Sequence, residues 1–261
     1  MAKLFSDRNR PVHMGRFPTE ILKRSPQMPD LDGLAPWPDL SFQRPADSAS
    51  LVPAMAEFQA MMDAVRDGPQ NSAPSEIPED RQERSNHLKA FAYFNDISMV
   101  GIAPLSPEDR LTAPRRNPQI DRLSLALQTR QTKTLAAGID VIMADLKESM
   151  TSKPQPMDHH AYALVFLVAY RRDPRRGETG CDWVQDAQAE RAAVLGAETA
   201  TVLANYIRIL GYSARAHSAT TCDVDLARLA VKAGLAQVAG EQISHPWLGQ
   251  RFGLAAVTTD M

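Results

Sequence analysis

From about residue 80 onward, apolar residues alternate between helix-like and strand-like spacing. Residues 80–95 place Phe94 and other apolar side chains at helical spacing, and residues 97–103 (ISMVGIA) form a short apolar run typical of a buried strand. Residues 162–170 (YALVFLVAY) are apolar throughout and rich in strand formers, but too few to span a membrane. We therefore expect 162–170 to be the central strand of a covered sheet.

Two longer segments have the apolar spacing of helices. Residues 131–150 carry their apolar side chains on one side of a helix, and a longer helix is predicted over 186–210. Gly211 is placed to end this second helix, as a glycine just past the last turn commonly does. The stripe expected to face inward on the second helix consists of Ala192, Leu195, Leu203, Tyr206 and Leu210.

The last fifty residues predict short strands separated by one more helix. Residues 213–217 and 253–258 (GLAAVT) are the strand candidates. Between them, Asp223 or Asp225 is placed to cap a helix that continues to Ala233. Helices that alternate with buried strands predict the α/β class, here as an α+β layered sandwich.

The first 79 residues have a different composition. Eleven of the 19 prolines fall there, and they interrupt regular structure except around 51–65, where Met55, Phe58, Met62 and Val65 have helical spacing. We predict an extended proline-rich arm over 1–50, this one helix, and a linker over 67–79, followed by a globular domain over 80–261. The arm's large apolar residues should lie on the domain or on a partner; they are Phe17, Ile21, Leu22, Trp37, Leu40 and Phe42.

Composition narrows the function classes. The 261 residues are 44% hydrophobic and 23% charged, with a formal net charge of −2, so neither nucleic acid nor an acidic membrane is an expected partner. No apolar stretch is long enough for a transmembrane helix, and the N-terminus lacks the apolar core of a secretory signal, so a cytoplasmic location is expected. Cys181 and Cys222 cannot supply the four thiolates of an iron–sulfur cluster, and we expect none in this chain.

Two charged motifs are candidates for binding sites. Adjacent histidines in an extended stretch point to opposite sides, so His159 and His160 are not expected to chelate one metal ion, and both are interpreted as solvated loop residues. Four arginines in 171–176 follow the central strand and could hold an anion, but a solvated charged turn is the favoured interpretation. We therefore assign no metal-binding residues.

Several segments together resemble a known family. They include HLKAFAYFNDISMVGIAPL (87–105), ANYIRILGYSARAH (204–217), LARLAVKAGLA (226–236) and RFGLAAVTTDM (251–261). This order is similar to the cobalamin-binding region of reductive dehalogenases, which are related to epoxyqueuosine reductases and have a nitroreductase-like fold. The opening FSDRNRPVHMGRFPTE resembles the cytosolic, catabolic branch of these dehalogenases.

The resemblance implies which residues approach a cofactor. In the family, the region of Ala214 and His217 and the glycine motif matched by Gly234 and Leu235 lie near the corrinoid, so these four residues are the predicted cofactor contacts. Cobalamin is the cofactor that the family resemblance implies.

The sequence also departs from the family at sites that matter for its chemistry. Counting back from Tyr206 of the Y-I-R triplet, Ala193 stands where the family has a tyrosine proton donor, and Ala236 replaces the second glycine of A-G-L-G. The cysteine-rich ferredoxin segment of the family has no counterpart in these 261 residues. The resemblance therefore implies a non-catalytic half, with no catalytic residues, which completes or stabilises an active cobalamin and iron–sulfur half supplied by the same or another chain.

Two alternatives remain open on the sequence. The chain could be a stand-alone corrinoid-binding oxidoreductase that draws electrons from a separate ferredoxin. It could also be an unrelated flavin- or ligand-binding protein with a nitroreductase-like fold.

Overall fold

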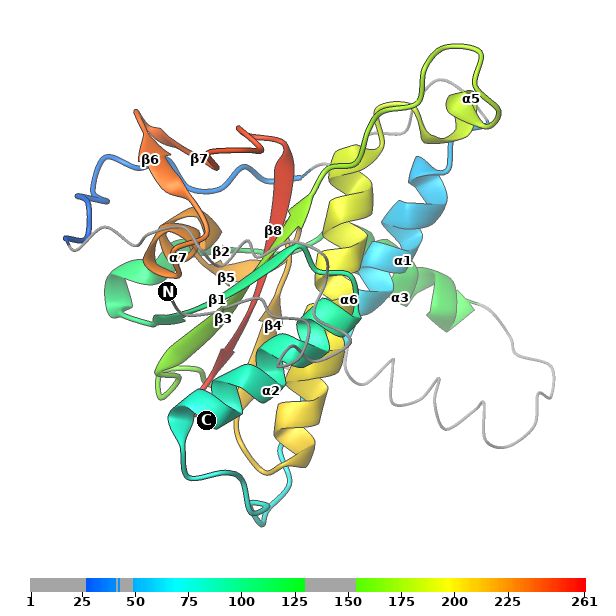
Figure 1. The fold of residues 1–261 in the computed structure, drawn as a ribbon. Coiled ribbons are helices and arrows are strands. Elements are labelled where there is room, and N and C mark those ends of the chain that lie inside the picture. The colour runs from blue at the N-terminus through cyan, green and yellow to red at the C-terminus, as the bar shows by residue number, and fades with distance from the viewer. Residues whose placement is uncertain (1–26, 41, 43–48, 130–153) are drawn as a thin grey trace.

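The computed structural model describes residues 27–40, 42, 49–129 and 154–261 and has a mixed α/β fold with antiparallel sheets (Figure 1). The helix predicted over 131–150 and the first 26 residues, including Phe17, Ile21 and Leu22, lie outside the described residues. The described helices are α1 (Val52–Ala64), α2 (Arg81–Phe94), η2 (Pro107–Asp109), α3 (Gln119–Thr129), α5 (Cys181–Val184), α6 (Gln188–Ile209) and α7 (Leu226–Lys232).

A four-stranded antiparallel sheet forms the centre of the molecule, in the order β1-β3-β8-β4. Its members are β1 (Met99–Pro104), β3 (Tyr162–Ala169), β8 (Phe252–Thr259) and β4 (Ala214–His217). The prediction for 162–170 is confirmed, because β3 lies between β1 and β8: it pairs with β8 along its whole length and with β1 from Tyr162 to Leu167. The smaller sheets pair β2 (Arg110–Arg115) with β5 (Cys222–Val224), and β6 (Gln237–Ala239) with β7 (Gln242–Ser244).

Helices cover both faces of the central sheet, as Figure 1 shows. The side chains of α2 and α6 pack on one face, together with alternate residues of β3 and β8 such as Phe166 and Val257. The other face packs against α7 and includes Leu167 and Leu254. Alternate strand residues point to opposite faces, so this two-sided burial explains why β3 and β8 are apolar without interruption.

The helix boundaries follow the sequence signals closely. The Asp225 side chain accepts hydrogen bonds from the backbone N–H groups of Ala227 and Arg228 and so caps α7, which decides between the two predicted caps, Asp223 and Asp225. Gly211 follows α6 with a φ of +89°, a left-handed conformation that favours glycine. The Asp80 side chain caps α2 in the same way as Asp225 caps α7.

The buried face of α1 includes polar side chains. Phe58 is 39% exposed, whereas Gln59 and Asp63 are almost fully buried. Asp63 accepts hydrogen bonds from four neutral side chains, which satisfy its carboxylate inside the protein. The donors are Gln59 (3.0 Å), Asn117 (2.9 Å), Ser218 (2.7 Å) and Thr220 (2.5 Å). The helix predicted around 51–65 is confirmed, and polar side chains form part of its buried face.

The described part of the arm, 27–40, lies on the domain without helix or strand of its own. Leu31 and Leu34 are buried in the core on the α7 side of the sheet. The Ala35 N–H donates to the Glu241 carbonyl at 2.8 Å, and the Arg228 guanidinium donates to the Leu31 carbonyl at 2.8 Å. This part of the arm therefore stabilises its own domain. None of the helices in the described part of the chain is long and apolar enough to cross a membrane.

Candidate functional site

The four predicted cofactor contacts do not share one surface. Ala214 and His217 both lie on β4, but Ala214 packs with α6, whereas His217 lies opposite Ala256 of the α7-side core. Leu235 follows α7 and is 1% exposed within that core, against the far edge strand β1, and Gly234 precedes it with a φ of +74°. The width of the sheet therefore separates the β4 pair from Gly234 and Leu235.

His217 is fully buried and both of its ring nitrogens have partners. The backbone N–H of Asp223 donates to Nδ1 at 3.3 Å, so Nε2 carries the proton and donates to Thr258 Oγ1 at 2.9 Å. Burial lowers the pKa of His217 to about 3, so the ring is neutral at pH 7. No ring nitrogen is left to bind a ligand, because both are used inside the protein.

As placed, these residues do not fit a corrinoid. A corrin ring needs a broad open surface, whereas Ala214, His217 and Leu235 are each at most 2% exposed and packed by protein atoms. Their assignment as cofactor contacts stays a prediction from the sequence.

The Y-I-R triplet of α6, Tyr206 to Arg208, has a structural role: it attaches the helix to the sheet. Arg208 is buried, and its guanidinium donates to the carbonyl oxygens of Ala214 (3.0 Å) and Arg66 (3.4 Å). Ile207 is fully buried beneath the sheet, whereas Tyr206 is 51% exposed. The triplet therefore fastens α6 to the start of β4 through its arginine.

A buried charged network lies beside His217. Arg66 donates to both carboxylate oxygens of Asp223, at 2.6 and 3.2 Å, and Arg215 bridges Asp223 (3.3 Å) and Asp67 (2.8 Å). Burial opposes ionisation of Asp223, but its interactions with His217, Arg66 and Arg215 outweigh burial and lower the pKa of the carboxyl group. Paired in this way, the charges hold the end of α1 against β4 and β5. Apolar spacing gives no signal for such a network.

His160 corrects a sequence interpretation. It is 4% exposed rather than solvated, and its ring bonds Thr258 Oγ1 and Ser213 Oγ, each at 2.8 Å. Burial and, to a smaller extent, the neighbouring His159 lower the pKa of His160 to about 4. The adjacent histidines differ because His159 turns outward to solvent. The arginine-rich turn, by contrast, is largely exposed as expected, with Arg172 paired to Glu178.

The cysteines and acidic groups offer no metal centre in the part of the chain that the structure describes. No group of three or more His, Cys, Asp or Glu side chains is arranged there to hold an ion. Cys222 is buried, its thiol donates to the Val224 carbonyl, and burial raises its pKa to about 12, so it is a poor nucleophile at neutral pH. Cys181 is a buried free thiol.

Helix α6 has a second apolar face that sequence reasoning assigned wrongly. Tyr206 was expected to face inward, yet it lies outward with Val202 (48% exposed) and Ile209 (53% exposed). These three residues are spaced at i, i+4 and i+7, so they form one stripe on the helix surface, here called the α6 outer stripe. The inner face of the same helix is apolar too, through the fully buried Leu203 and Ile207.

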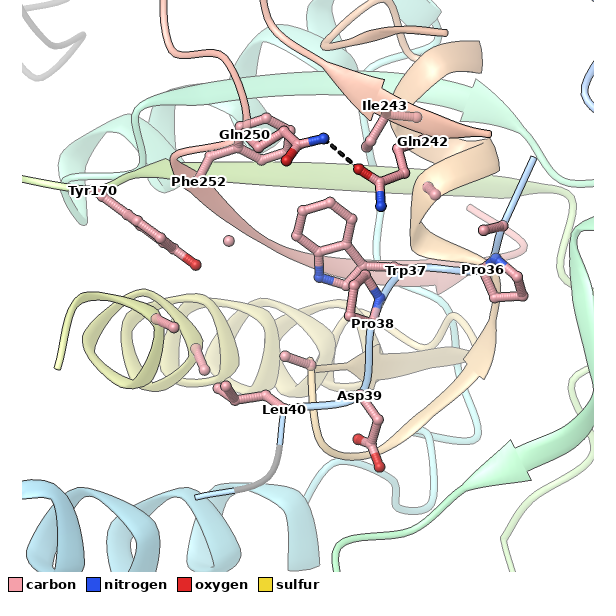
Figure 2. A pocket seen from close by; sticks show the side chains of 16 residues that line it. Pro36, Trp37, Pro38, Asp39, Leu40, Tyr170, Gln242, Ile243, Gln250 and Phe252 are labelled. Atoms are coloured by element: carbon pink, nitrogen blue, oxygen red, sulfur yellow. Dashed lines mark hydrogen bonds between the residues drawn. The ribbon is translucent and has the colours of Figure 1, made fainter. Parts of the chain in front are cut away.

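A cavity of about 260 Å³ lies where β3 ends and β8 begins (Figure 2). Its walls include Trp37 from the arm, Tyr170 just after β3 and Phe252 of β8. Ala193, the position where the family resemblance implied a proton donor, lines the cavity from α6. The sequence predicted that Trp37 lies on the domain or on a partner, but it gave no sign that these residues meet.

Comparisons with known proteins show which solved structures this fold resembles. No family model matches the sequence, and no curated protein matches it. Among solved structures, the chain is similar to the catabolic reductive dehalogenase NpRdhA in complex with 3-bromo-4-hydroxybenzoic acid, with 31% identity and a TM-score of 0.68. It is also similar to a reductive dehalogenase whose structure suggests a mechanism for B12-dependent dehalogenation, with 32% identity and a TM-score of 0.68.

Both alignments cover nearly all of this chain but only part of the dehalogenase chain. Each covers 98% of this chain but 30% of the dehalogenase chain, so this chain spans about a third of the length of these proteins. The similarity shows a dehalogenase-like protein with a reductive-dehalogenase-like fold. The nitroreductase-like layering and the relationship to epoxyqueuosine reductases stay predictions from the sequence.

Proposed function

We propose that this chain is a non-catalytic half of a reductive dehalogenase, which pairs with and stabilises a second half that binds cobalamin and iron–sulfur clusters. The observation that carries the proposal is the unequal coverage: nearly all of this chain matches 30% of a dehalogenase chain. In such a protein the greater part of the length lies outside the matched region and is available for the cofactors.

The α6 outer stripe supports a partner on this side of the molecule. A helix whose apolar residues cover only one side lies on a protein surface, whereas one that is apolar on two sides is typically enclosed between two bodies. Val202, Tyr206 and Ile209 are about half exposed, although the opposite face of α6 already packs on the sheet. A second domain placed on the stripe would remove these side chains from water.

The proposed partner is the cobalamin and iron–sulfur half of a dehalogenase, in the same polypeptide or in another chain. Its chemistry requires thiolates for the cluster and an acid that delivers a proton. In this chain the only two cysteines are Cys181 and Cys222, both buried, and Ala193 has no proton to give. Reductive removal of halide would therefore belong to the partner.

A cobalamin-binding measurement tests the proposed division of roles. Hydroxocobalamin is mixed with this chain alone, with the cysteine-carrying half alone, and with both, and each sample is desalted before its absorbance spectrum is recorded. We expect the cysteine-carrying half to retain the corrinoid and this chain alone to retain none. Stoichiometric retention by this chain alone would instead support the stand-alone corrinoid protein.

A further inference from the structure

A short piece of the arm covers the cavity near Trp37. All six residues from 35 to 40 line the cavity, and this segment is here called the lid. The other side of the cavity is apolar and buried, since Phe252, Ala193 and Ala227 are each at most 2% exposed. Figure 2 shows the Trp37 ring reaching from the lid into the space between β8 and α6. The lid therefore separates buried parts of the domain from solvent.

Few contacts hold the lid in place. Four of its six residues are exposed, and the other two, Trp37 and Leu40, are only partly buried. The backbone N–H of Ala35 donates to the Glu241 carbonyl at 2.8 Å. A longer bond of 3.3 Å joins the Leu40 N–H to the Ala219 carbonyl. By comparison, β3 is bonded to a strand on each side.

Trp37 fastens the lid to the sheet. Its ring stacks on Phe252 with ring centroids 5.3 Å apart and an interplanar angle of 16°, and its backbone N–H interacts with the Asp225 carboxylate. Next to the ring, however, lies a cavity of about 260 Å³ instead of packed side chains. A segment that covers a void loses dispersion contacts, because it has no neighbouring atoms on that side.

The residues just before the lid are fixed much more firmly. Leu31 and Leu34 are each 8% exposed in the core on the α7 side of the sheet. The Leu34 N–H donates to the Leu31 carbonyl at 3.1 Å, and the Arg228 guanidinium donates to the same carbonyl at 2.8 Å. This turn can therefore stay in place when the lid moves.

The sequence of the lid, A-P-W-P-D-L, makes it stiff. Pro36 and Pro38 fix their own φ angles and favour extended conformations for Ala35 and Trp37, the residues that precede them. Neither proline has an N–H with which to bond the domain. A stiff segment with few bonds moves as one piece about its ends, because bending within it is disfavoured.

We propose that residues 35–40 open and close over the cavity while the rest of the domain stays folded. In the closed form Trp37 rests on Phe252 and solutes cannot reach Ala193. In the open form the cavity floor is accessible to molecules much larger than water. Segments with few buried contacts open locally at a free energy well below that of global unfolding. The movement involves this chain alone, so the inference stands or fails separately from the proposed function.

A thiol placed beneath the lid measures its opening. In the full chain, Cys181 and Cys222 are changed to alanine. One cysteine is then introduced by Ala193→Cys in the cavity floor, or by Ala200→Cys on the same helix but in the core against the sheet. Both positions are at most 2% exposed, so labelling requires an opening. With methyl methanethiosulfonate, we expect the Ala193→Cys variant to react at least about a hundredfold faster than the Ala200→Cys variant, which reacts only on global unfolding.

A second reagent distinguishes an opening lid from a permanent gap. Dithiobis(nitrobenzoate) is much larger than methyl methanethiosulfonate. Each labelling rate is divided by the rate of the same reagent with free cysteine. We expect the same ratio for both reagents in the Ala193→Cys variant, because an open lid admits both. A fixed gap beside Trp37 would instead admit the small reagent and exclude the large one.

One substitution in the lid tests its bonds to the domain. Ala35→Pro removes the N–H that donates to the Glu241 carbonyl and should speed labelling of the Ala193→Cys variant about threefold to tenfold. The matched control Ala35→Ser keeps that N–H at the same exposed position and should leave the rate unchanged. Neither change should affect the Ala200→Cys variant. Circular dichroism checks folding, and if the Ala193→Cys variant does not fold, Ala227→Cys, which also lines the cavity, replaces it.

Three results would overturn the proposal. The first is equally slow labelling of the Ala193→Cys and Ala200→Cys variants, which would show that the lid opens only when the domain unfolds. The second is a much lower ratio for dithiobis(nitrobenzoate) than for methyl methanethiosulfonate, which would indicate a fixed gap. The third is the same labelling rate with Ala35→Pro as with Ala35→Ser, which would show that another segment opens.

Discussion

Two buried histidines make the stability of the folded protein depend on pH. His217 and His160 both bond Thr258 and are neutral in the folded protein, where burial holds their pKa values at about 3 and about 4. In the unfolded chain a histidine titrates near pH 6.5. Between those values the unfolded state binds protons that the folded state cannot, so stability falls as the pH is lowered.

We therefore predict that the free energy of unfolding decreases from pH 6.5 to pH 5 by about 1.4 kcal/mol per pH unit for each buried histidine. Urea unfolding measured at several pH values tests this. His217→Asn should lower stability at pH 7 and reduce the slope with pH, while His87→Asn, at an exposed position, should change neither. A slope that is the same in the His217→Asn variant would show that this histidine is not buried in its neutral form.

At the scale of elements, the contact between β1 and α7 depends on the absence of a side chain at Gly101. A Cβ built there would lie 2.6 Å from the Ala233 carbonyl oxygen and 2.8 Å from its Cβ, both closer than real contacts. The neighbouring atom is backbone that follows α7 directly, so it cannot move away cheaply.

Gly101→Ala should therefore destabilise the protein by about 1–3 kcal/mol through overpacking. Gly33→Ala is the matched control, because a Cβ at Gly33 meets no atom within 4 Å. Chemical denaturation gives both values, and equal stability of the two variants would contradict the close packing of β1 on α7.

Sequence patterns predicted the elements better than their orientations. The strand at 162–170 could be recognised because burial on both faces requires an unbroken apolar run, and Gly211 and Asp225 marked helix ends through local chemistry. Apolar spacing gave no sign of the polar buried face of α1, because Asp63 is satisfied there by hydrogen bonds from residues more than fifty positions away. Tyr206 was misplaced because α6 is apolar on two sides, and spacing alone cannot tell which side faces the sheet.

The cavity shows that sequence patterns also do not predict which residues the fold brings together in a site. Trp37, Tyr170 and Gln242 come from the arm, the end of β3 and the β6–β7 hairpin, and only the fold brings them together. The family resemblance supplied Ala193 as a missing proton donor, but it could not show that the position lines a cavity.

At the scale of the whole molecule, the described residues form a well-covered core but leave an apolar stripe on one outer surface. The central sheet is covered on both faces, and the described part of the arm closes over the α7 side. The α6 outer stripe nevertheless leaves Val202, Tyr206 and Ile209 about half exposed. Fully burying such a side chain is worth about 1.5–3 kcal/mol, and covering the exposed half of each would contribute about half of that to an interface.

Titration calorimetry between this chain and the cysteine-carrying half tests the central claim most directly. That half is identified as a second Y-I-R and L-G-Y pattern followed by clustered cysteines, in the same reading frame or the adjacent gene. We predict one-to-one binding that is weakened at least about a hundredfold by the combined changes Val202→Ser, Tyr206→Ser and Ile209→Ser. Trp247→Ser, at a residue that is 67% exposed elsewhere on the surface, should bind as the unchanged chain does. No association, or binding that is unaffected by the triple change, would contradict the account.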